Sequence, residues 1–245
     1  MDLKNKIVLV TGSSRGIGKA IALLFAKKGA KVIVNYSKSE KEANEVVNEI
    51  KNISDCIAIK CDVSNENQVK KMIEKIIQKY GRLDILINNA GKYIDGDEWN
   101  GSSDIWEETL RQNLISAMNT SKYAAQIFIK QKSGAIVNIA SRHSVSGQFD
   151  ALAYAASKAG IVSITQAYAK LLAPFAKVNS VSPGATRAGY WLHAPKEELE
   201  EITSKHDKKL IEPEEIANVV LSLFSPEHSN VNGQNIIVDE RENVK

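Results

Sequence analysis

Short apolar runs alternate with longer amphipathic segments along this sequence, and the alternation constrains the fold more than any other feature. Seven runs are apolar on both faces, which predicts strands buried within a parallel sheet. They cover residues 6–10, 31–35, 56–59, 83–88, 135–139, 177–181 and 235–238. Helical periodicity occupies residues 17–28, 65–79, 103–131, 152–172 and 213–224. The pattern predicts a single α/β domain over residues 1–245, built on a doubly wound, seven-stranded parallel sheet.

The composition argues against several classes of function. The 245 residues carry a formal net charge of only +3, with acids and bases interspersed, so neither nucleic acid nor an anionic membrane is indicated as a partner. The longest apolar run, residues 20–26, is too short to span a bilayer. The N-terminal residues contain no apolar signal region, and the two cysteines and four histidines lack metal-ligand spacing. We therefore expect a soluble, cytoplasmic protein without a metal site.

A glycine-rich turn joins the first predicted strand to the first predicted helix. Gly12, Gly16 and Gly18 follow the strand in a Gly-x-x-x-Gly-x-Gly pattern. Glycines let the backbone turn sharply and approach a pyrophosphate, while the N–H groups at the helix start face the phosphates. Because the turn lies in this strand–helix context, it predicts a dinucleotide site of the Rossmann type.

The end of the second strand bears on the choice of cofactor. NAD-preferring sites usually place an acid there, and this sequence has Asn35-Tyr36-Ser37-Lys38 with no acid before Glu40. Arg15 and Lys38 could balance a 2′-phosphate, although Lys38 is equally well explained as a solvated surface cation. The sequence thus favours NADP(H), with NAD(H) as the alternative.

Tyr154 and Lys158 are spaced so that a helix places them on one face. A nearby ammonium favours phenolate, so we expect Lys158 to lower the pKa of Tyr154 and make it a general acid/base. Ser141 follows the fifth predicted strand, where its hydroxyl could bind a carbonyl oxygen. This is the edge of the sheet where ligands bind.

With these residues in place, the sequence resembles the short-chain dehydrogenase/reductase family, and in particular its 3-oxoacyl-acyl-carrier-protein reductases. Several motifs occur in the family's order and spacing over nearly the whole chain. They are Thr11-Gly12-x-x-x-Gly16-Ile17-Gly18, Cys61-Asp62-Val63, Asn88-Asn89-Ala90-Gly91, Asn113, Ser141, Tyr154-x-x-x-Lys158 and Pro183-Gly184.

The resemblance implies roles for four catalytic residues. Ser141 would orient the substrate carbonyl and Tyr154 would donate the proton. Lys158 would hold the nicotinamide ribose and tune Tyr154, while Asn113 would hold a water in the proton relay.

The resemblance also implies a set of cofactor-binding residues. Asp62 would bond the adenine amine and Val63 would lie against its ring. The adenosine ribose would be lined by Asn89, Ala90 and Gly91, and the nicotinamide would be flanked by Pro183, Gly184 and Thr186. The predicted set is completed by Gly12, Ser14, Arg15, Gly16, Ile17, Gly18, Ser37, Tyr154 and Lys158. NADP-preferring members commonly carry a base at the place of Arg15, whereas Tyr36 aligns with the acid of NAD-preferring members.

Two further expectations concern assembly and the substrate lid. The family implies a homo-oligomer, a tetramer, although Asp239-Glu240-Arg241 replaces glycines that commonly lie near subunit contacts. The lid is expected at about residues 187–208, where Tyr190, Trp191, Leu192 and His193 cluster; a purely structural helix is the alternative. His143, two residues after Ser141, could face the substrate.

Three functions remain open from the sequence. The first is an NADP(H)-dependent reductase of a 3-oxoacyl thioester, whose substrate is either free or bound to an acyl carrier that docks on Arg142, Arg187 and Lys122. The second is a reductase or dehydrogenase of another small ketone, sugar or polycyclic alcohol. The third is a non-catalytic, cofactor-binding regulator, against which the complete set of Asn113, Ser141, Tyr154 and Lys158 argues.

Overall fold

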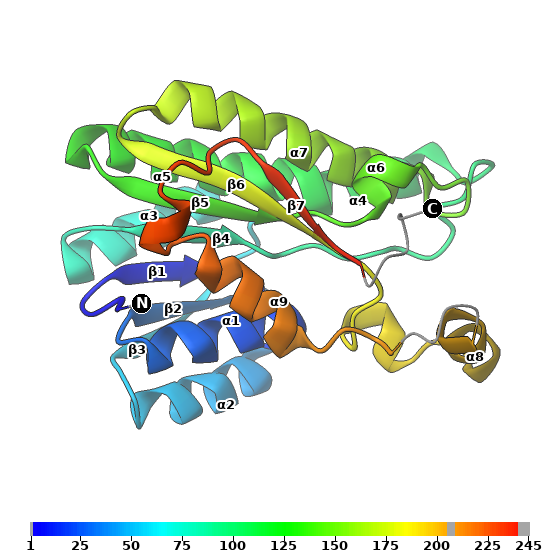
Figure 1. Cartoon of the computed structure of the whole chain (residues 1–245), viewed down its shortest axis with the longest axis horizontal. Helices are drawn as coiled ribbons and strands as arrows, with labels where there is room; N and C mark the ends of the chain where they lie inside the picture. Colours follow the sequence, from blue (N-terminus) through cyan, green and yellow to red (C-terminus); the bar gives the residue numbers. More distant parts are fainter. Residues whose placement is uncertain (1, 205–208, 240–245) are drawn as a thin grey trace.

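The computed structural model describes residues 2–204 and 209–239, and its centre is one parallel sheet (Figure 1). The strand order is β3-β2-β1-β4-β5-β6-β7, and every neighbouring pair is parallel. The strands are β1 (Ile7–Val10), β2 (Lys31–Tyr36), β3 (Cys56–Lys60), β4 (Ile85–Asn88), β5 (Gly134–Ile139), β6 (Ala176–Pro183) and β7 (Asn235–Val238). The predicted seven-stranded, doubly wound sheet is therefore confirmed.

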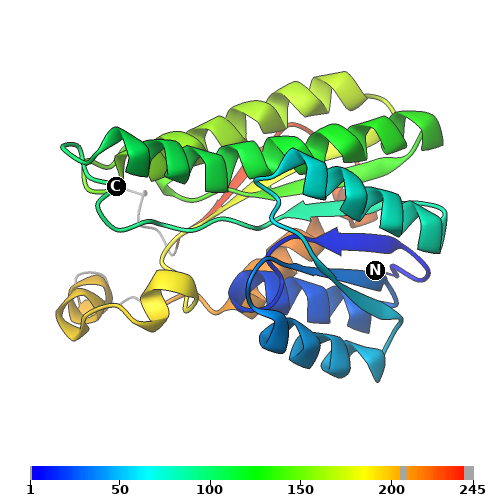
Figure 2. The same ribbon diagram turned by 180° about the vertical axis from the view of Figure 1, so that it is seen from behind.

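Helices cover both faces of this sheet, as the views from the two sides show (Figures 1 and 2). One face packs against α1 (Gly16–Lys27), α2 (Glu40–Lys51) and α9 (Pro213–Ser222). The other packs against α3 (Glu66–Tyr80), α5 (Ser116–Gln131) and α7 (Leu152–Leu172). Alternate residues of β1 serve the two cores, since Val8 and Val10 join the first and Ile7 and Leu9 the second.

Two helical predictions need correction. Helix α2 was not predicted, although Ala43, Val46, Val47 and Ile50 form its buried stripe at helical spacing. The segment predicted as one helix over 103–131 consists of α4 (Ser103–Leu110), a π-helical turn (Arg111–Ile115) and α5. Hydrophobic periodicity did not reveal the π turn because the chain continues as a helix on either side of it.

The remaining helical segments lie near the carboxyl ends of the strands, except for the 3-10 turn that precedes β7, which lies near the amino ends. They are α6 (His143–Ser146), the 3-10 turn Gly189–Leu192, α8 (Lys196–Ser204) and the 3-10 turn Pro226–His228. No helix in the described ranges is both long and apolar enough to cross a membrane.

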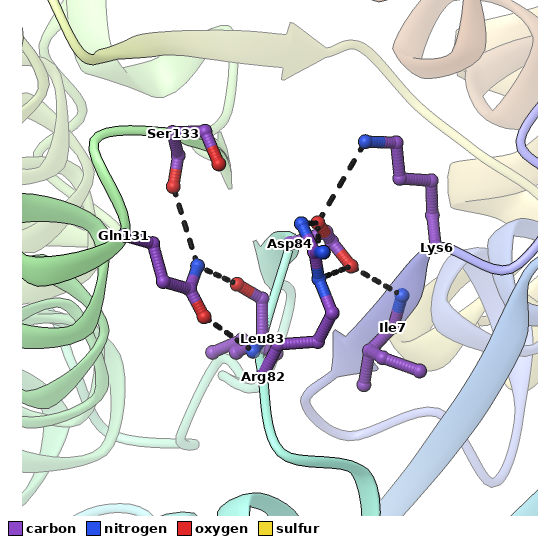
Figure 3. A network of polar contacts seen from close by, with 7 residues as sticks. All are labelled: Lys6, Ile7, Arg82, Leu83, Asp84, Gln131 and Ser133. Carbon is purple, nitrogen blue, oxygen red and sulfur yellow. Dashed lines mark hydrogen bonds and ion pairs between the residues drawn. The ribbon is translucent and has the colours of Figure 1, made fainter.

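A buried carboxylate ties β1 to β4 at the amino ends of these strands (Figure 3). Asp84 accepts hydrogen bonds from the Ile7 amide at 2.9 Å and from Arg82, and Lys6 lies 3.7 Å away. Beside it, the Gln131 amide bonds both the N–H and the carbonyl of Leu83. Strands β1 and β4 are thereby tied together at their amino ends, away from the glycine-rich turn. Their carboxyl ends lie where the strand order reverses, which is the place where ligands bind in sheets of this kind.

Candidate active site

A cavity of about 740 Å³ lies at the carboxyl ends of the strands and brings together most of the predicted site residues. Those lining it are Gly12, Arg15, Gly16, Ile17, Asn89, Gly91, Ser141, Tyr154, Lys158, Pro183, Gly184 and Thr186. The predicted residues outside its lining are Ser14, Gly18, Ser37, Asp62, Val63, Ala90 and Asn113. The cavity therefore joins the glycine-rich turn to the candidate catalytic residues in one continuous space.

The glycine-rich turn has a shape that side chains would obstruct. Gly12 and Gly16 have positive φ angles of 61° and 56°, which favour glycine. A Cβ atom at Gly12 would lie 3.0 Å from the Cα atom of Ala90. Helix α1 begins at Gly16 and has no side-chain cap at Arg15, so its first N–H groups remain available to an anion.

Two residues to which the sequence analysis assigned no role hold this turn in place. The Asn35 side chain accepts from the Gly12 amide at 3.1 Å and donates to the Cys61 carbonyl at 3.0 Å. The Thr11 hydroxyl accepts from the amides of Asn89 and Ala90, at 2.9 and 3.0 Å. Each is a polar residue at or just after the end of a predicted strand, and this position does not identify its hydrogen-bond partners. These bonds preorganise the turn.

Gly18 acts beneath the turn rather than within the cavity. A Cβ atom there would lie 2.5 Å from the Asn89 side-chain nitrogen, which donates to the carbonyls of Thr11 and Gly12. The absence of a side chain at Gly18 therefore leaves room for Asn89 to bond the carbonyls of the glycine-rich turn.

The adenosine side of the predicted site is more open. Arg15 and Ser37 are exposed, whereas Ser14 is buried. The Asp62 carboxylate accepts from the amide and hydroxyl of Ser64, at 3.0 and 2.8 Å, which fixes its orientation after β3. Burial, followed by the charge and hydrogen bond of Glu40, raises the pKa of Tyr36, which packs in the core at the end of β2. Tyr36 is thus a poor position for an introduced acid.

Three predicted catalytic side chains converge at the base of the cavity. Helix α7 presents Tyr154 and Lys158, and Ser141 follows β5. The Lys158 Nζ atom lies 5.5 Å from the centroid of the Tyr154 ring, and the Ser141 hydroxyl is close enough to the Tyr154 phenol to act on its pKa. This arrangement can polarise a carbonyl oxygen and protonate it from the same side.

The expectation that the pKa of Tyr154 is lowered is wrong for the protein without a cofactor. Burial raises the pKa of Tyr154, and the hydrogen bond with Ser141 opposes that rise only in part. Burial also lowers the pKa of Lys158 to about 8. Proximity to an ammonium was the basis of the prediction, but burial is the largest effect on the pKa of Tyr154, and Ser141 is the group that acts against it. A raised pKa keeps Tyr154 protonated, the form in which it can donate.

Asn113 lies in the π-helical turn and its side chain is fully buried. Its amide donates to the carbonyls of Lys92 and Thr109, and its oxygen accepts from the Lys92 amide at 3.0 Å. A Cβ atom at Gly91 would lie 2.4 Å from that oxygen. The Asn113 side chain therefore anchors the segment after Gly91, and the predicted water relay is not tested by this geometry.

Aromatic rings lie between the candidate catalytic residues and the predicted lid. The Tyr93 ring lies edge-on to Tyr154 at 6.3 Å and to Tyr190 at 5.9 Å, and the His143 ring lies 6.0 Å from Tyr154. Tyr190 also packs against Trp191 at 5.4 Å and bonds Glu198 of α8 through its hydroxyl. Tyr93 was not singled out in the sequence, whereas His143 and the 190–193 cluster do line the cavity as expected.

The proposed carrier-docking residues do not stand out as one basic surface. Lys122 pairs with Glu66 at 2.7 Å and Arg187 with Glu212 at 2.8 Å, so local carboxylates balance both charges. Arg142 lines the cavity itself. The described residues contain no cluster of three or more His, Cys, Asp or Glu side chains arranged to hold a metal ion. Glu240, Arg241 and the last residues of the predicted lid fall outside the described ranges.

The fold and this cavity define a dinucleotide-binding oxidoreductase of the doubly wound α/β class. The family model for short chain dehydrogenases matches residues 6–198, and the chain belongs to this family. It is accordingly an NAD(P)-dependent enzyme that transfers hydride between a nicotinamide cofactor and a carbonyl or secondary alcohol.

Similar proteins cover nearly the whole chain. A 3-oxoacyl-[acyl-carrier-protein] reductase FabG of Thermotoga maritima is 36% identical over 242 residues, covering 98% of each chain. A 3-oxoacyl-[acyl-carrier-protein] reductase of Synechocystis is 35% identical and covers 97% of this chain and 96% of its own. A 7α-hydroxysteroid dehydrogenase complexed with NADH and 7-oxo glycochenodeoxycholic acid superposes with a TM-score of 0.91 at 30% identity, covering 98% of this chain and 94% of its own.

Proposed function

We propose that this protein is an NADP(H)-dependent ketone reductase whose first candidate substrate class is 3-oxoacyl thioesters. The observation that carries the proposal is the placement of Tyr154, with its Ser141 and Lys158 neighbours, in the same cavity as the glycine-rich turn. The thioester class is supported by the 3-oxoacyl-[acyl-carrier-protein] reductases, which are 35–36% identical to this chain.

The residues present fit a dinucleotide. Gly12 and Gly16 leave a cradle that a Cβ atom would fill or strain, and the free N–H groups of α1 can receive the pyrophosphate. When bound, a reduced nicotinamide supplies hydride to the carbonyl carbon. The ring would lie beside Pro183, Gly184 and Thr186, which line the cavity near Tyr154. Asp62, Val63 and the segment Asn89–Gly91 would hold the adenosine.

The chain's own residues manage the proton and the oxygen. Ser141 would donate a hydrogen bond to the carbonyl oxygen, which fixes it beside the Tyr154 phenol. Tyr154 would transfer its proton to that oxygen as negative charge develops there. The Lys158 ammonium donates to the Ile139 carbonyl at 3.0 Å, and its other N–H groups would bind a ribose hydroxyl and stabilise the resulting phenolate. Asn113 would anchor the neighbouring segment and order a water for reprotonation.

The preference for NADP(H) over NAD(H) rests on the charges around the 2′ position. Arg15 lines the cavity at the start of α1 and is exposed, so its planar guanidinium can reach a phosphate. The exposed Ser37 and Lys38 follow β2 without an intervening acid that would repel the phosphate.

A second substrate class, ring-bearing ketones, is favoured by the aromatic rings around Tyr154. Tyr93, His143, Tyr190 and Trp191 surround the approach to Tyr154, and flat rings pack well against such edges and faces. The likeness to a 7α-hydroxysteroid dehydrogenase points the same way. Lys122 pairs with Glu66 and Arg187 pairs with Glu212, which also weakens the case for docking of an acidic carrier on these two residues.

A two-cofactor screen tests the proposal. Acetoacetyl thioesters of coenzyme A and of acyl-carrier protein, simple cyclic diketones and 7-oxo bile acids would each be assayed with NADPH and NADH. We expect the highest kcat/KM with an acetoacetyl thioester and NADPH. A clear preference for cyclic ketones would favour the second class, and no turnover of any carbonyl would contradict the proposal.

The assembly and location complete the proposal. A homotetramer in the cytoplasm is expected from the family. The oligomer is supported by the exposed apolar side chains of Ile115 at the end of the π-helical turn, Met118 and Ile129 in α5, and Leu171 near the end of α7. Multi-angle light scattering should give about four times the chain mass of 26.9 kDa. A monomer at every concentration would contradict it.

A further inference from the structure

The first turn of the helix that carries Tyr154 has no cap of its own. Helix α7 runs from Leu152 to Leu172, its preceding residue Ala151 makes no side-chain cap, and no acid lies in the first turn. The first N–H groups of a helix have no partner within the helix and need one from elsewhere. In α7 these groups belong to Leu152, Ala153 and Tyr154.

One residue from a distant segment satisfies all three. The Asp97 carbonyl accepts from the Leu152 amide at 2.7 Å. Its two carboxylate oxygens accept from the amides of Ala153, at 2.9 Å, and Tyr154, at 2.6 Å. Asp97 is fully buried, so neither water nor a surface cation screens these contacts. A carboxylate at this position also complements the positive end of the 21-residue helix.

Asp97 is connected in turn to the cofactor side of the cavity. Asp97 is the last residue of the segment 92–97. The first residue of this segment, Lys92, is held by Asn113, whose side chain bonds both the amide and the carbonyl of Lys92. Between the two anchors lies Tyr93, whose ring packs against Tyr154 and whose hydroxyl donates to the Asp150 carbonyl at 3.2 Å. The segment therefore links the residue after Gly91 to the start of α7.

We propose that Asp97 is a positioning residue for catalysis, which sets the place of the Tyr154 phenol by holding the Tyr154 main chain. The proposal rests on the proposed role of Tyr154 as proton donor. Misplacement of a reacting group by about 1 Å can lower a rate by about 100-fold, so the cap bears on turnover and not only on folding. Cofactor binding should depend on it much less, because the glycine-rich turn is held by Asn35 and Thr11 instead.

Asp97→Asn is the main variant, because it keeps the side-chain volume but places an N–H group against one of the two amides. Glu98→Gln is the matched control, since Glu98 is the next residue and is exposed. Turnover of NADPH with the acetoacetyl thioester, or with a cyclic ketone that the wild type reduces, is normalised to NADPH-binding sites counted by fluorescence titration. Wild-type turnover tests the proposed function, whereas the ratio of variant to wild type tests Asp97.

We expect Asp97→Asn to lower kcat per binding site at least ~10-fold, with the Kd for NADPH changed less than about twofold. Amide hydrogen exchange should accelerate at Ala153 and Tyr154, and Glu98→Gln should match the wild type in every measurement. Near wild-type kcat in Asp97→Asn, or loss of NADPH binding in parallel with kcat, would overturn the proposal. Exchange on the wild type alone gives an independent check, because fast exchange at the Ala153 and Tyr154 amides would also contradict it.

Discussion

The Lys158 Nζ atom lies 5.5 Å from the centroid of the Tyr154 ring and donates a 3.0 Å hydrogen bond to the Ile139 carbonyl. Lys158 is only 4% exposed, so its charge is held in the interior beside a phenol. Burial lowers the pKa of Lys158 to about 8, which means that folding disfavours the ammonium form. A charge kept at this cost is typical of a site selected for chemistry rather than stability.

Replacing Lys158 by Met should therefore stabilise the fold while abolishing activity. The unfolded state binds more protons than the folded state between the folded pKa of about 8 and the ordinary value of 10.5. The ammonium thus destabilises the wild type at pH 7, and this penalty fades as the pH rises through that window. We expect Lys158→Met to gain about 1–3 kcal/mol at pH 7 and less above pH 10. Denaturant unfolding at both pH values measures the difference in free energy of unfolding between the variant and the wild type. The matched control is Lys170→Met, at an exposed lysine of the same helix. A lower stability of Lys158→Met at pH 7 would refute the argument.

His143 should make the protein sensitive to mild acid. Burial, and then the charge of Arg142, lowers the pKa of His143 to about 4 from 6.5. Between these values the unfolded state binds the extra proton, so stability falls as the pH drops from about 6.5 towards 4. The Gln side chain of His143→Gln stays neutral at both pH values. Between pH 7.5 and pH 5, the free energy of unfolding of this variant should therefore fall by about 1–2 kcal/mol less than that of the wild type. Equal pH dependence in the two proteins would rule out this assignment; the exposed His193→Gln is the matched control.

Arg15 should determine much of the cofactor preference. A charge-assisted contact contributes about 1.5–3 kcal/mol, so the wild type should prefer NADPH by roughly 10- to 150-fold in kcat/KM. Arg15→Gln should remove most of this preference and leave NADH turnover nearly unchanged. Ser37→Asp should shift the preference further towards NADH by repelling the 2′-phosphate. Steady-state kcat/KM with both cofactors decides the matter, and an NADH preference in the wild type would show that the pocket does not select a phosphate.

Asp84 should contribute to stability without affecting catalysis. It is 5% exposed, accepts from the Ile7 amide and pairs with Arg82 at the end of the sheet away from the cavity. Asp84→Ala leaves the buried Ile7 amide without an acceptor, and we expect a loss of about 1–3 kcal/mol. The kcat of the folded fraction should equal that of the wild type. A large fall in kcat under conditions where all of the variant is folded would contradict this, because it would show that Asp84 affects catalysis at the opposite end of the sheet.

Local patterns in the sequence predicted the sheet well, and they predicted that Tyr154 and Lys158 lie close together on one helix. Each strand contains a short run rich in apolar residues, and the spacing of Tyr154 and Lys158 depends only on helical geometry. Long-range partners could not be predicted in this way. Asp97 is one of several polar residues in an irregular segment, and its contact with Tyr154 spans 57 positions of sequence. Asn35 likewise lies in an ordinary buried strand, and only the fold places it beside Gly12.

Electrostatic consequences were also beyond the sequence. The spacing of Tyr154 and Lys158 indicates proximity, but the direction of a pKa shift depends on how much burial opposes the neighbouring charge. Tyr36 aligned with the acid of NAD-preferring relatives, yet its side chain packs in the core. Position along the strand was therefore predictable, whereas the environment of the side chain was not.

Tyr154→Phe is the measurement that tests the central claim most directly. The substitution removes the phenolic hydroxyl and retains the ring that packs against Tyr93 and His143. In NADPH-dependent reduction of an acetoacetyl thioester, or of whichever ketone the screen identifies, we expect kcat to fall at least ~10²-fold. The Kd for NADPH should change little, because the glycine-rich turn is untouched. Near-normal turnover by Tyr154→Phe would contradict the account.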